Sequence, residues 1–328
     1  MKKLALGILS VLLFSPLAAR ADTWRFVVMG DDRVDVKDAN ADNIKTGIHE
    51  KVLKPLLDAA AAEKPEFVLF TGDLVSGVAG KVTTPFDQQL IAWQGLVAGR
   101  GLSFLPVRGN HETIAGAGND ALSIWKTWFT AFPDKPTGIN FFPGEECLSY
   151  SYTAAKDPTV AVIGLDQYST PHHVNLDKLK ERIESLEKSG VKTMFVFAHE
   201  MAFTCGSHPD ADNMASDKKS RDDFMDLLQQ HNIRFFFAGH DHMFDWMLIH
   251  KKTWPAGAEV HQIVGGTSGA PFYPDGGYTG DKDFELTRIA HKDFQDGRPG
   301  SNYGYVVVEI KDGEIASVNF RQVDVPNP

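Results

Sequence analysis

The chain contains 328 residues and carries a formal net charge of −10. This length is ordinary for one large α/β domain, and the sequence contains no repeats, low-complexity segments or long linkers that would divide it. The acidic balance argues against nucleic acid or an anionic membrane as the main partner, because both require clusters of Lys and Arg. A phosphate substrate is still compatible with it, since bound metal ions can supply positive charge locally.

The first residues predict a secretory signal peptide at residues 1–21. Lys2 and Lys3 form a basic start, the stretch Leu4–Leu17 is mainly apolar, and Ala19–Ala21 fits the small-x-small cleavage pattern. The alternative, an uncleaved membrane anchor, is less favoured because the apolar stretch is shorter than the roughly 20 residues of a spanning helix. Cleavage would remove three basic residues, which leaves a mature protein of net charge −13 in the periplasm or secreted, with no membrane segment.

Five short apolar runs each end at a side chain that can bind a metal ion. Runs of this kind, rich in β-branched and aromatic residues, are typical of buried strands, and ligands collect at the carboxyl ends of such strands. The runs cover residues 25–30, 67–72, 103–109, 193–198 and 234–239, and they lead to Asp31, Asp73, Asn110 with His111, His199, and His240 with His242. Their oxygen and nitrogen atoms would meet along one rim, which predicts a metal site and favours a hydrolase.

Helical periodicity and turn residues predict the other elements. Apolar spacing predicts helices over 46–62, 86–98, 119–132, 176–189 and 221–231. Further strands are expected over 148–153, 159–165, 260–264, 303–310 and 314–321, the last two joined as a hairpin. A chain that begins βαβαβ and ends in antiparallel strands predicts an α/β fold of two packed sheets with helices outside. The segments 200–220 and 265–302 are expected to be long loops that form walls or lids of the site.

Each motif is weak alone, but their order and spacing point to one site. Gly-Asp after a strand is often an ordinary turn, and a single His is usually a surface residue. His240 and His242 are stronger candidates, because side chains two residues apart on extended backbone point to the same side. The motifs at 31, 73, 110, 199 and 240 lie 42, 37, 89 and 41 positions apart, which leaves room each time for a crossover helix and a returning strand.

On these motifs, from about Arg25 to His242, the chain resembles the calcineurin-like metallophosphoesterases, a superfamily that includes purple acid phosphatases and many exported phosphodiesterases. The resemblance implies a four-layer sandwich of two mainly mixed β-sheets flanked by helices, with residues 22–328 as the phosphoesterase domain. It implies two divalent or trivalent metal ions, for which Fe, Mn, Zn or Co suit the donor atoms. The implied ligands are Asp73 as a bridge, Asn110, His199 and His240 for one ion, and Asp31 and His242 for the other. His111 would lie beside the phosphate as general acid or transition-state stabiliser, and Asn110 would also contact the substrate.

The first motif departs from the family pattern. Relatives carry Asp-x-His there, whereas this chain has Asp31-Asp32-Arg33. Arg33 cannot ligate a metal, because its guanidinium stays protonated and has no lone pair. Asp32, another neighbour or water could replace the missing ligand, while Arg33 could bind a substrate phosphate or pair with a nearby acid. The chain also continues Leu74-Val75-Ser76, without the tyrosine of purple acid phosphatases or the acid of protein phosphatases.

The leading hypothesis is an exported phosphoesterase that hydrolyses a small phosphomonoester or phosphodiester through a metal-activated hydroxide at a dinuclear centre. The alternative is a non-enzymatic phosphate or metal binder in which Arg33 has disabled one metal site. A third hypothesis is a structural exported domain whose His and Asp residues make only hydrogen bonds. The two cysteines, Cys147 and Cys205, lack metal-site spacing, and both a disulfide and two separate thiols are open.

Overall fold

Two β-sheets form the centre of the computed structural model, which describes residues 23–37, 45–132, 136–278, 281–292 and 302–325. The first sheet has the order β13 (Glu314–Gln322), β12 (Gly304–Lys311), β1 (Thr23–Met29), β2 (Val68–Phe70) and β3 (Phe104–Pro106). The second has the order β11 (Phe284–Lys292), β9 (Phe244–Lys251), β10 (Val260–Gly265), β8 (Phe235–Ala238), β7 (Thr193–Phe197), β6 (Val160–Gly164), β5 (Tyr150–Thr153) and β4 (Asn140–Phe141). Both sheets are mixed: β1 is parallel to β2 but antiparallel to β12, and β7 is parallel to β8 whereas β9 is antiparallel to β10.

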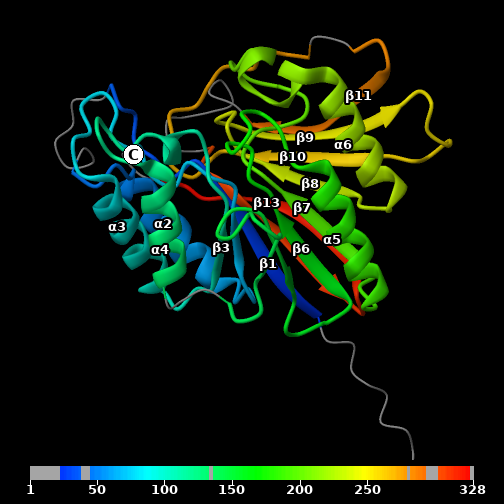
Figure 1. Ribbon diagram of the computed structural model, residues 1–328, viewed down its shortest axis with the longest axis horizontal. Coiled ribbons are helices and arrows are strands. Elements are labelled where there is room, and N and C mark those ends of the chain that lie inside the picture. Colours follow the sequence, from blue (N-terminus) through cyan, green and yellow to red (C-terminus); the bar gives the residue numbers. More distant parts are fainter. Residues whose placement is uncertain (1–22, 38–44, 133–135, 279–280, 293–301, 326–328) are drawn as a thin grey trace, which may run out of the picture.

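Helices cover the outer faces of both sheets. In the described residues these are α2 (Glu50–Ala62), α3 (Phe86–Ala98), α4 (Ala121–Ala131), α5 (Leu176–Lys188) and α6 (Lys218–Gln230). Figure 1 shows α2, α3 and α4 beside the first sheet and α5 and α6 beside the second. The predicted α/β fold, a four-layer sandwich of two mixed sheets flanked by helices, is confirmed.

Alternating side chains on the central strands supply two hydrophobic cores. Phe195 and Phe197 of β7 belong to the core that fills the space between the sheets and extends under α2, α3 and α4. Met194 and Val196 of the same strand belong to the core under α5 and α6. This division follows from the strand geometry, in which successive side chains point to opposite faces. Strands buried on both faces explain why the sequence signal was a continuous apolar run rather than an alternation.

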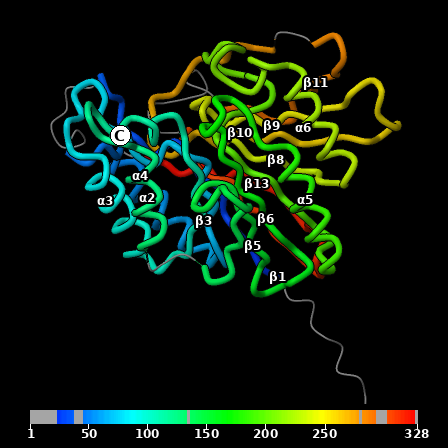
Figure 2. The backbone as a smooth tube through the Cα atoms, in the orientation of Figure 1, coloured from blue at the N-terminus to red at the C-terminus, as the bar shows by residue number. Residues whose placement is uncertain are grey.

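β1, the first strand of the described chain, pairs with β12, one of its last two strands. β1 pairs with β12 from Thr23 opposite Lys311 to Val28 opposite Val306. Figure 2 shows this pairing as the first strand of the chain running next to the last two. Because β12 pairs with one edge of β1 and β2 with the other, β1 is a central strand and its carboxyl end is held in place.

The structure corrects the expected start of the first helix. α2 begins at Glu50 rather than at residue 46, because Ile48 forms a β-bridge with Arg33 and residues 45–47 form a turn. In the opposite sense, α6 begins at Lys218 rather than at 221. The carboxylate of Asp217 caps it by accepting hydrogen bonds from the backbone N–H groups of Lys219 and Ser220.

The prediction that 265–302 is one long loop was wrong. Residues 284–292 form β11, the edge strand of the second sheet, which pairs antiparallel with β9. Neither β9 nor the short β4 was predicted. β11 escaped prediction because eight of its nine residues are exposed or partly exposed, so it carries no continuous apolar run. The 200–220 segment contains only short 3₁₀ turns, at Asp210–Asp212 and Met214–Asp217, before α6 begins.

Three other expectations concern export and the cysteines. The predicted signal peptide at residues 1–21 lies outside the described residues. None of the helices in the described part of the chain combines the length and the apolar character that crossing a bilayer requires. Cys147 and Cys205 are both buried free thiols, and they belong to different hydrophobic cores, so the structure has no disulfide between them.

Candidate metal centre

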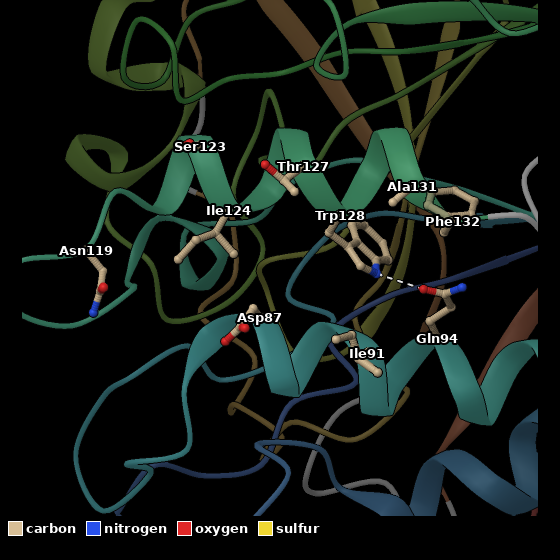
Figure 3. Close-up of a pocket in the computed structure, with 10 residues that line it drawn as sticks. All are labelled: Asp87, Ile91, Gln94, Asn119, Ser123, Ile124, Thr127, Trp128, Ala131 and Phe132. Atoms are coloured by element: carbon tan, nitrogen blue, oxygen red, sulfur yellow. Dashed lines mark hydrogen bonds between the residues drawn. The ribbon is translucent and has the colours of Figure 1, made fainter.

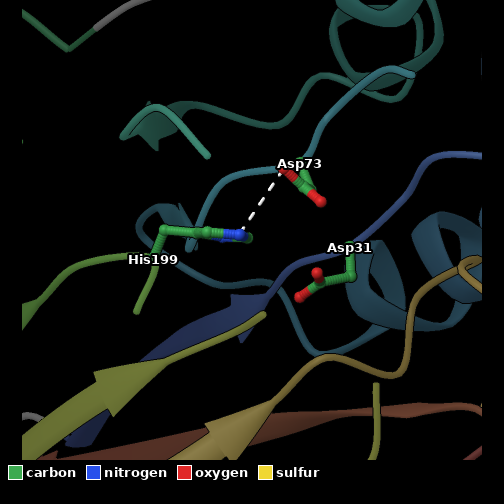
Figure 4. Close-up of side chains that lie close together, drawn as sticks. All are labelled: Asp31, Asp73 and His199. Carbon is green, nitrogen blue, oxygen red and sulfur yellow. Dashed lines mark ion pairs between the residues drawn. The ribbon is translucent and has the colours of Figure 1, made fainter. Parts of the chain in front are cut away.

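The eight candidate site residues come together where strands from both sheets end. Asp31 and Arg33 follow β1, Asp73 follows β2, Asn110 and His111 follow β3, His199 follows β7, and His240 and His242 lie between β8 and β9. Figure 4 shows the side chains of Asp31, Asp73 and His199 pointing toward one another. These three buried residues each offer a ligand atom within 4.8 Å of the other two. The arrangement is therefore built by both sheets.

The site has two halves that share Asp73. We call Asn110, His199 and His240 the His199 half, and Asp31, Arg33 and His242 the Arg33 half. One carboxylate oxygen of Asp73, Oδ1, lies 3.5 Å from Nε2 of His199. The other, Oδ2, lies 3.0 Å from Nε of Arg33. Asp73 thus presents one oxygen to each half.

The backbone at three of these positions is strained. Asp31, Asp73 and His240 have φ values of 62°, 52° and 70°, in the left-handed region that side chains other than glycine rarely adopt. Such conformations cost on the order of 1–3 kcal/mol each and persist where the surrounding structure holds them. The neighbouring Gly109 and Gly239 are required by close approach, because a Cβ there would collide with the carboxylates of Asp73 and Asp31. The fold therefore directs the side chains of Asp31, Asp73 and His240 toward one another at a cost in backbone energy.

In the His199 half, acceptor atoms gather around one imidazole nitrogen. Nδ1 of His199 lies 2.7 Å from the carbonyl oxygen of Thr71. A carbonyl can only accept, so Nδ1 carries the hydrogen and Nε2 keeps a lone pair in the neutral ring. That Nε2 lies 3.1 Å from Oδ1 of Asn110, 3.1 Å from Nδ1 of His240 and 3.5 Å from Oδ1 of Asp73.

His240 presents a lone pair to the same point. Its Nε2 lies 3.0 Å from the carbonyl oxygen of Asp212 and donates to it, which leaves Nδ1 as the acceptor. Burial lowers the pKa of His199, and burial together with His199 lowers the pKa of His240 well below its usual value, so both rings are neutral. Four lone-pair atoms thus face one another without a hydrogen between them. A bound metal cation would make such an arrangement favourable.

In the Arg33 half, the acceptor atoms already face a cation. Nδ1 of His242 donates to the carbonyl oxygen of Pro271 at 2.7 Å, so its Nε2 carries the lone pair. Nη2 of Arg33 lies 3.3 Å from this Nε2, while Nε of Arg33 donates to Oδ2 of Asp73 at 3.0 Å. Asp31 completes the group, with Oδ1 3.5 Å from Nε2 of His242. Of the two roles open for Arg33, the structure contains the ion pair with an acid.

The two aspartates differ in charge balance. Burial and the nearby Asp73 raise the pKa of Asp31 well above its usual range. Burial also opposes the charge of Asp73, but His111, His199 and Arg33 outweigh it and lower the pKa of that carboxyl. Two buried carboxylates in one place require more positive charge than a single guanidinium provides, as expected of a site for metal ions.

Glu112, a residue that the sequence did not single out, supports Asp73 from behind. Its carboxylate accepts hydrogen bonds from the backbone N–H groups of Asp73 at 2.9 Å, Gly109 at 2.6 Å and Val75 at 3.2 Å. The side chain is fully buried, and burial together with Asp73 raises the pKa of Glu112 to about 8. Glu112 ties the loops after β2 and β3 together and holds Asp73 in its left-handed conformation. The sequence signal that could have singled out Glu112 was its position directly after His111.

His111 lies beside Asp73 with one ring nitrogen directed toward the site. Its backbone N–H donates to Oδ1 of Asp73 at 3.0 Å, and its Nδ1 donates to the carbonyl oxygen of Ser76 at 2.7 Å. Nε2 lies 4.0 Å from Oδ2 of Asp73. Burial lowers the pKa of His111, so at neutral pH this Nε2 is an unprotonated nitrogen next to the candidate metal position.

Asp241, between the two candidate ligands His240 and His242, fastens a loop over the site. Its carboxylate accepts hydrogen bonds from the hydroxyl of Thr204, from the backbone N–H groups of Cys205 and Gly206, and from the ring of His208. The His208 ring stacks on that of His240, with centroids 3.7 Å apart. The start of the 200–220 segment is therefore a wall of the site, as the sequence predicted for that segment.

The 265–302 segment contributes a second wall in its first part. Tyr273 stacks on His242 with ring centroids 4.2 Å apart. The backbone N–H groups of Ser268 and Ala270 donate to the carbonyl oxygens of Gly30 and Asp31. This turn therefore packs directly against the backbone at the end of β1.

Asp32, considered as a substitute ligand for the missing histidine, turns away from the centre. Its Oδ2 accepts a hydrogen bond of 2.7 Å from the indole N–H of Trp93, which belongs to α3. Trp93 is fully buried in the core beneath the first sheet. Asp32 therefore points to the helix layer, and the Arg33 half gains no ligand from it.

An apolar groove of about 510 Å³ lies elsewhere, between α3 and α4. Figure 3 shows Ile91, Ile124 and Trp128 lining it, with the Trp128 indole donating to Oε1 of Gln94 at 3.0 Å. None of the eight candidate residues lines this groove. Trp128 is only 6% exposed and belongs to the hydrophobic core of the first sheet.

Comparison with known proteins gives a family and a fold. A family model described as calcineurin-like phosphoesterase matches residues 41–244. No curated protein sequence matches the chain. A purple acid phosphatase from yellow lupin (Lupinus luteus) seeds is similar in structure, with a TM-score of 0.62 and 14% identity over 94% of this chain and 53% of that one. The structure of PhoD gives a TM-score of 0.55 and 10% identity over 94% of this chain and 70% of that one. At these identities the likeness establishes the fold, and this chain spans about half the length of the lupin enzyme.

Proposed function

Because the chain belongs to the calcineurin-like phosphoesterase family, we propose that it is a metal-dependent enzyme that hydrolyses a small phosphomonoester or phosphodiester. The observation that carries this proposal is the His199 half, in which four lone-pair atoms converge without a hydrogen between them. Carboxylate, amide oxygen and imidazole suit Fe, Mn, Zn or Co, and none of the four donors is a thiolate. The residues present therefore fit the metal that the family implies.

We assign to the candidate ligands the roles that the family resemblance implies. Asp73 would ligate through Oδ1, the oxygen that it turns to the His199 half, and Asn110, His199 and His240 would complete that position. Asp31 and His242 are the donors of the Arg33 half. The expectation of two metal ions stays a prediction. Metal ions in such a centre lower the pKa of water and offset the charge of a phosphoryl group during in-line displacement.

The chain's own residues would position the ester and handle the proton. Asn110, whose Oδ1 faces His199, would turn its amide N–H groups to a phosphate oxygen. His111 is held through Nδ1 by Ser76, so its Nε2 is the atom that, once it has taken up a proton, would donate a hydrogen bond or that proton to the leaving group. Thr204–His208 and Tyr273 would limit the access of water to the reacting groups.

Turnover of model esters tests the proposal. Protein loaded with Mn²⁺ or Zn²⁺ should hydrolyse p-nitrophenyl phosphate or bis-p-nitrophenyl phosphate, and His111→Ala should lower kcat by roughly 10²–10⁴-fold with unchanged metal content. His231→Ala is the matched control, since His231 pairs with Glu187 at the end of α6 and should leave kcat unchanged. If the metal-loaded wild type hydrolyses neither ester, the proposal fails.

The non-enzymatic alternative has one observation in its favour. Arg33 contacts Asp73 and His242, two of the donors on which a second metal ion would depend. A phosphate or metal binder without catalysis would retain metal and bind inorganic phosphate, yet it would show no turnover of either ester. The same assay therefore separates the two functions.

We propose the remaining features on the sequence alone. These are export after removal of residues 1–21, a phosphoesterase domain over residues 22–328, and a small phosphorylated molecule as the partner. Sequencing the N-terminus of the mature protein from each cell fraction would test the first of them.

A further inference from the structure

The guanidinium of Arg33 contacts candidate metal-ligand atoms at the Arg33 half of the site. Its Nε donates to Oδ2 of Asp73 at 3.0 Å, and its Nη2 lies 3.3 Å from the lone pair on Nε2 of His242. These two atoms are the ones that a metal ion in this half would need. A lone pair that accepts a hydrogen bond from a guanidinium is not free to ligate a metal ion at the same time.

The hydrogen-bond inventory distinguishes the two halves. In the His199 half, Nε2 of His199 faces three further acceptor atoms, and no hydrogen-bond donor from the described part of the chain lies between them. In the Arg33 half, the comparable nitrogen of His242 faces an N–H group that carries a positive charge. The His199 half would be stabilised by a cation from outside the chain, whereas the Arg33 half already contains a cation, the guanidinium of Arg33.

Arg33 is firmly held in this place. The residue is 7% exposed, its Nη1 donates to the carbonyl oxygen of Val34 at 3.3 Å, and its backbone N–H donates to the carbonyl oxygen of Asp73 at 3.2 Å. Arg33 also forms the β-bridge with Ile48 that delays the start of α2. Because backbone and side chain are both fixed, moving the guanidinium away would leave a buried charge without its partners.

We propose that the centre binds a single metal ion, in the His199 half, and that the guanidinium of Arg33 takes the place and part of the charge of the second. The inference rests on the proposed metal centre but not on turnover. Asp73, Val34 and His242 use three of the five N–H groups of the guanidinium, and Tyr273 also makes a side-chain hydrogen bond with Arg33. A remaining N–H would bind an oxygen of the substrate phosphate, as a second metal ion does in a dinuclear enzyme.

Metal content and the magnetic state of bound Mn²⁺ test this without measuring activity. After loading with Mn²⁺ and removal of excess metal, the wild type should contain about one ion per chain, in contrast to the pair of a two-metal site. Its electron paramagnetic resonance spectrum should have the resolved hyperfine pattern of an isolated ion. Arg33→His, which supplies the ligand found in relatives, should bind about one more ion and give the broadened spectrum of a coupled pair.

Two further variants locate the ion and guard against a failure of Arg33→His to fold. His240→Asn should lose the Mn²⁺, and His242→Asn should retain it, because only His240 belongs to the metal-binding half. Asn suits the left-handed backbone at position 240. Either the opposite pattern, or a folded Arg33→His that still binds one ion, would overturn the proposal.

The outcomes also separate this inference from the proposed function. A wild type with two ions and turnover overturns the single-ion centre and leaves the enzyme intact. A wild type with one ion and no turnover of either ester supports the single-ion centre and defeats the enzyme. A wild type that binds no metal defeats both.

Discussion

The two halves of the site use similar side chains but meet opposite electrostatic requirements. Each half sets a histidine lone pair against a carboxylate oxygen of Asp73 or Asp31, at 3.5 Å in both cases. Among the described residues, no cationic side chain contacts the histidine nitrogen of the His199 half, while in the Arg33 half the guanidinium lies 3.3 Å from Nε2 of His242 and donates to Oδ2 of Asp73. The comparison teaches that a donor set alone does not define a metal site. The charge that already stands among the donors decides whether a metal ion is needed.

The largest effect is expected at Asp73, the residue that the halves share. Asp73→Asn removes a charge from both halves, while Asn tolerates the left-handed backbone at this position. We expect metal content to fall to background and kcat/KM to drop by about 10³-fold or more, because the metal supplies several kcal/mol of charge stabilisation. Elemental analysis and ester hydrolysis measure the two effects.

Asp32→Asn is the matched control for this prediction. Asp32 is next in the sequence to the candidate ligand Asp31, but its carboxylate faces away from the site and accepts a hydrogen bond from the indole N–H of Trp93. The side-chain oxygen of an Asn can still accept this hydrogen bond. Retained metal and activity are expected. A loss equal to that of Asp73→Asn would show that charge in the region, rather than ligation by Asp73, is what matters.

The next largest effect separates the halves directly. His240→Asn should weaken Mn²⁺ binding by at least about 10²-fold, whereas His242→Asn should change it by less than about 10-fold. Isothermal titration of the metal-free proteins measures both affinities. Equal losses in the two variants would remove the distinction between the halves.

A smaller effect, on stability, is expected at Glu112, which supports Asp73. Glu112→Gln replaces one carboxylate oxygen by an amide group that cannot accept, so at least one backbone N–H of Asp73, Gly109 or Val75 loses its partner. The free energy of unfolding should fall by about 1–3 kcal/mol in urea titrations of the metal-free protein. Glu285→Gln, at an exposed position of β11, should leave the free energy of unfolding unchanged. If Glu285→Gln lowered it by the same amount as Glu112→Gln, the stabilising role of Glu112 would be contradicted.

The smallest effect per pH unit concerns the residue after His199. Burial raises the pKa of Glu200 to about 8, and its carboxyl group contacts Nδ1 of His172 at 3.0 Å. The folded protein therefore keeps a proton that the unfolded chain releases near 4.5, so this group makes stability fall as pH rises from about 4.5 to 8. Glu200→Gln should remove a slope of at most about 1.4 kcal/mol per pH unit. Parallel wild-type and variant curves of unfolding free energy against pH would contradict the shift.

Much of the fold and the meeting of the site residues follow from a simple sequence signal. The five apolar runs are strands buried on both faces, so each is visible without an alternating pattern, and each ends close to the residue expected. α3 was predicted with its observed bounds because Pro85 and Gly99 flank its apolar spacing. The strand ends place side chains on one rim whatever the detailed packing, which is why the eight candidates could be grouped from the sequence.

What the sequence could not supply depends on contacts between distant segments. β11 is held at the sheet edge by its register with β9, and its own residues carry little apolar pattern. The direction of the Arg33 side chain depends on His242, 209 positions away. The support that Glu112 gives to Asp73 crosses from one strand end to the next, which composition and spacing do not record.

The hydrogen bonds of Asp241 also bear on how quickly metal can be exchanged. One carboxylate between two candidate ligands holds Thr204, Cys205, Gly206 and His208, and the ring of His208 covers that of His240. Because the same residue fastens this wall and lies between the two histidines, opening of the segment would also loosen the hold on His240. Release of a metal ion from the His199 half to a chelator would then be faster when these hydrogen bonds are removed.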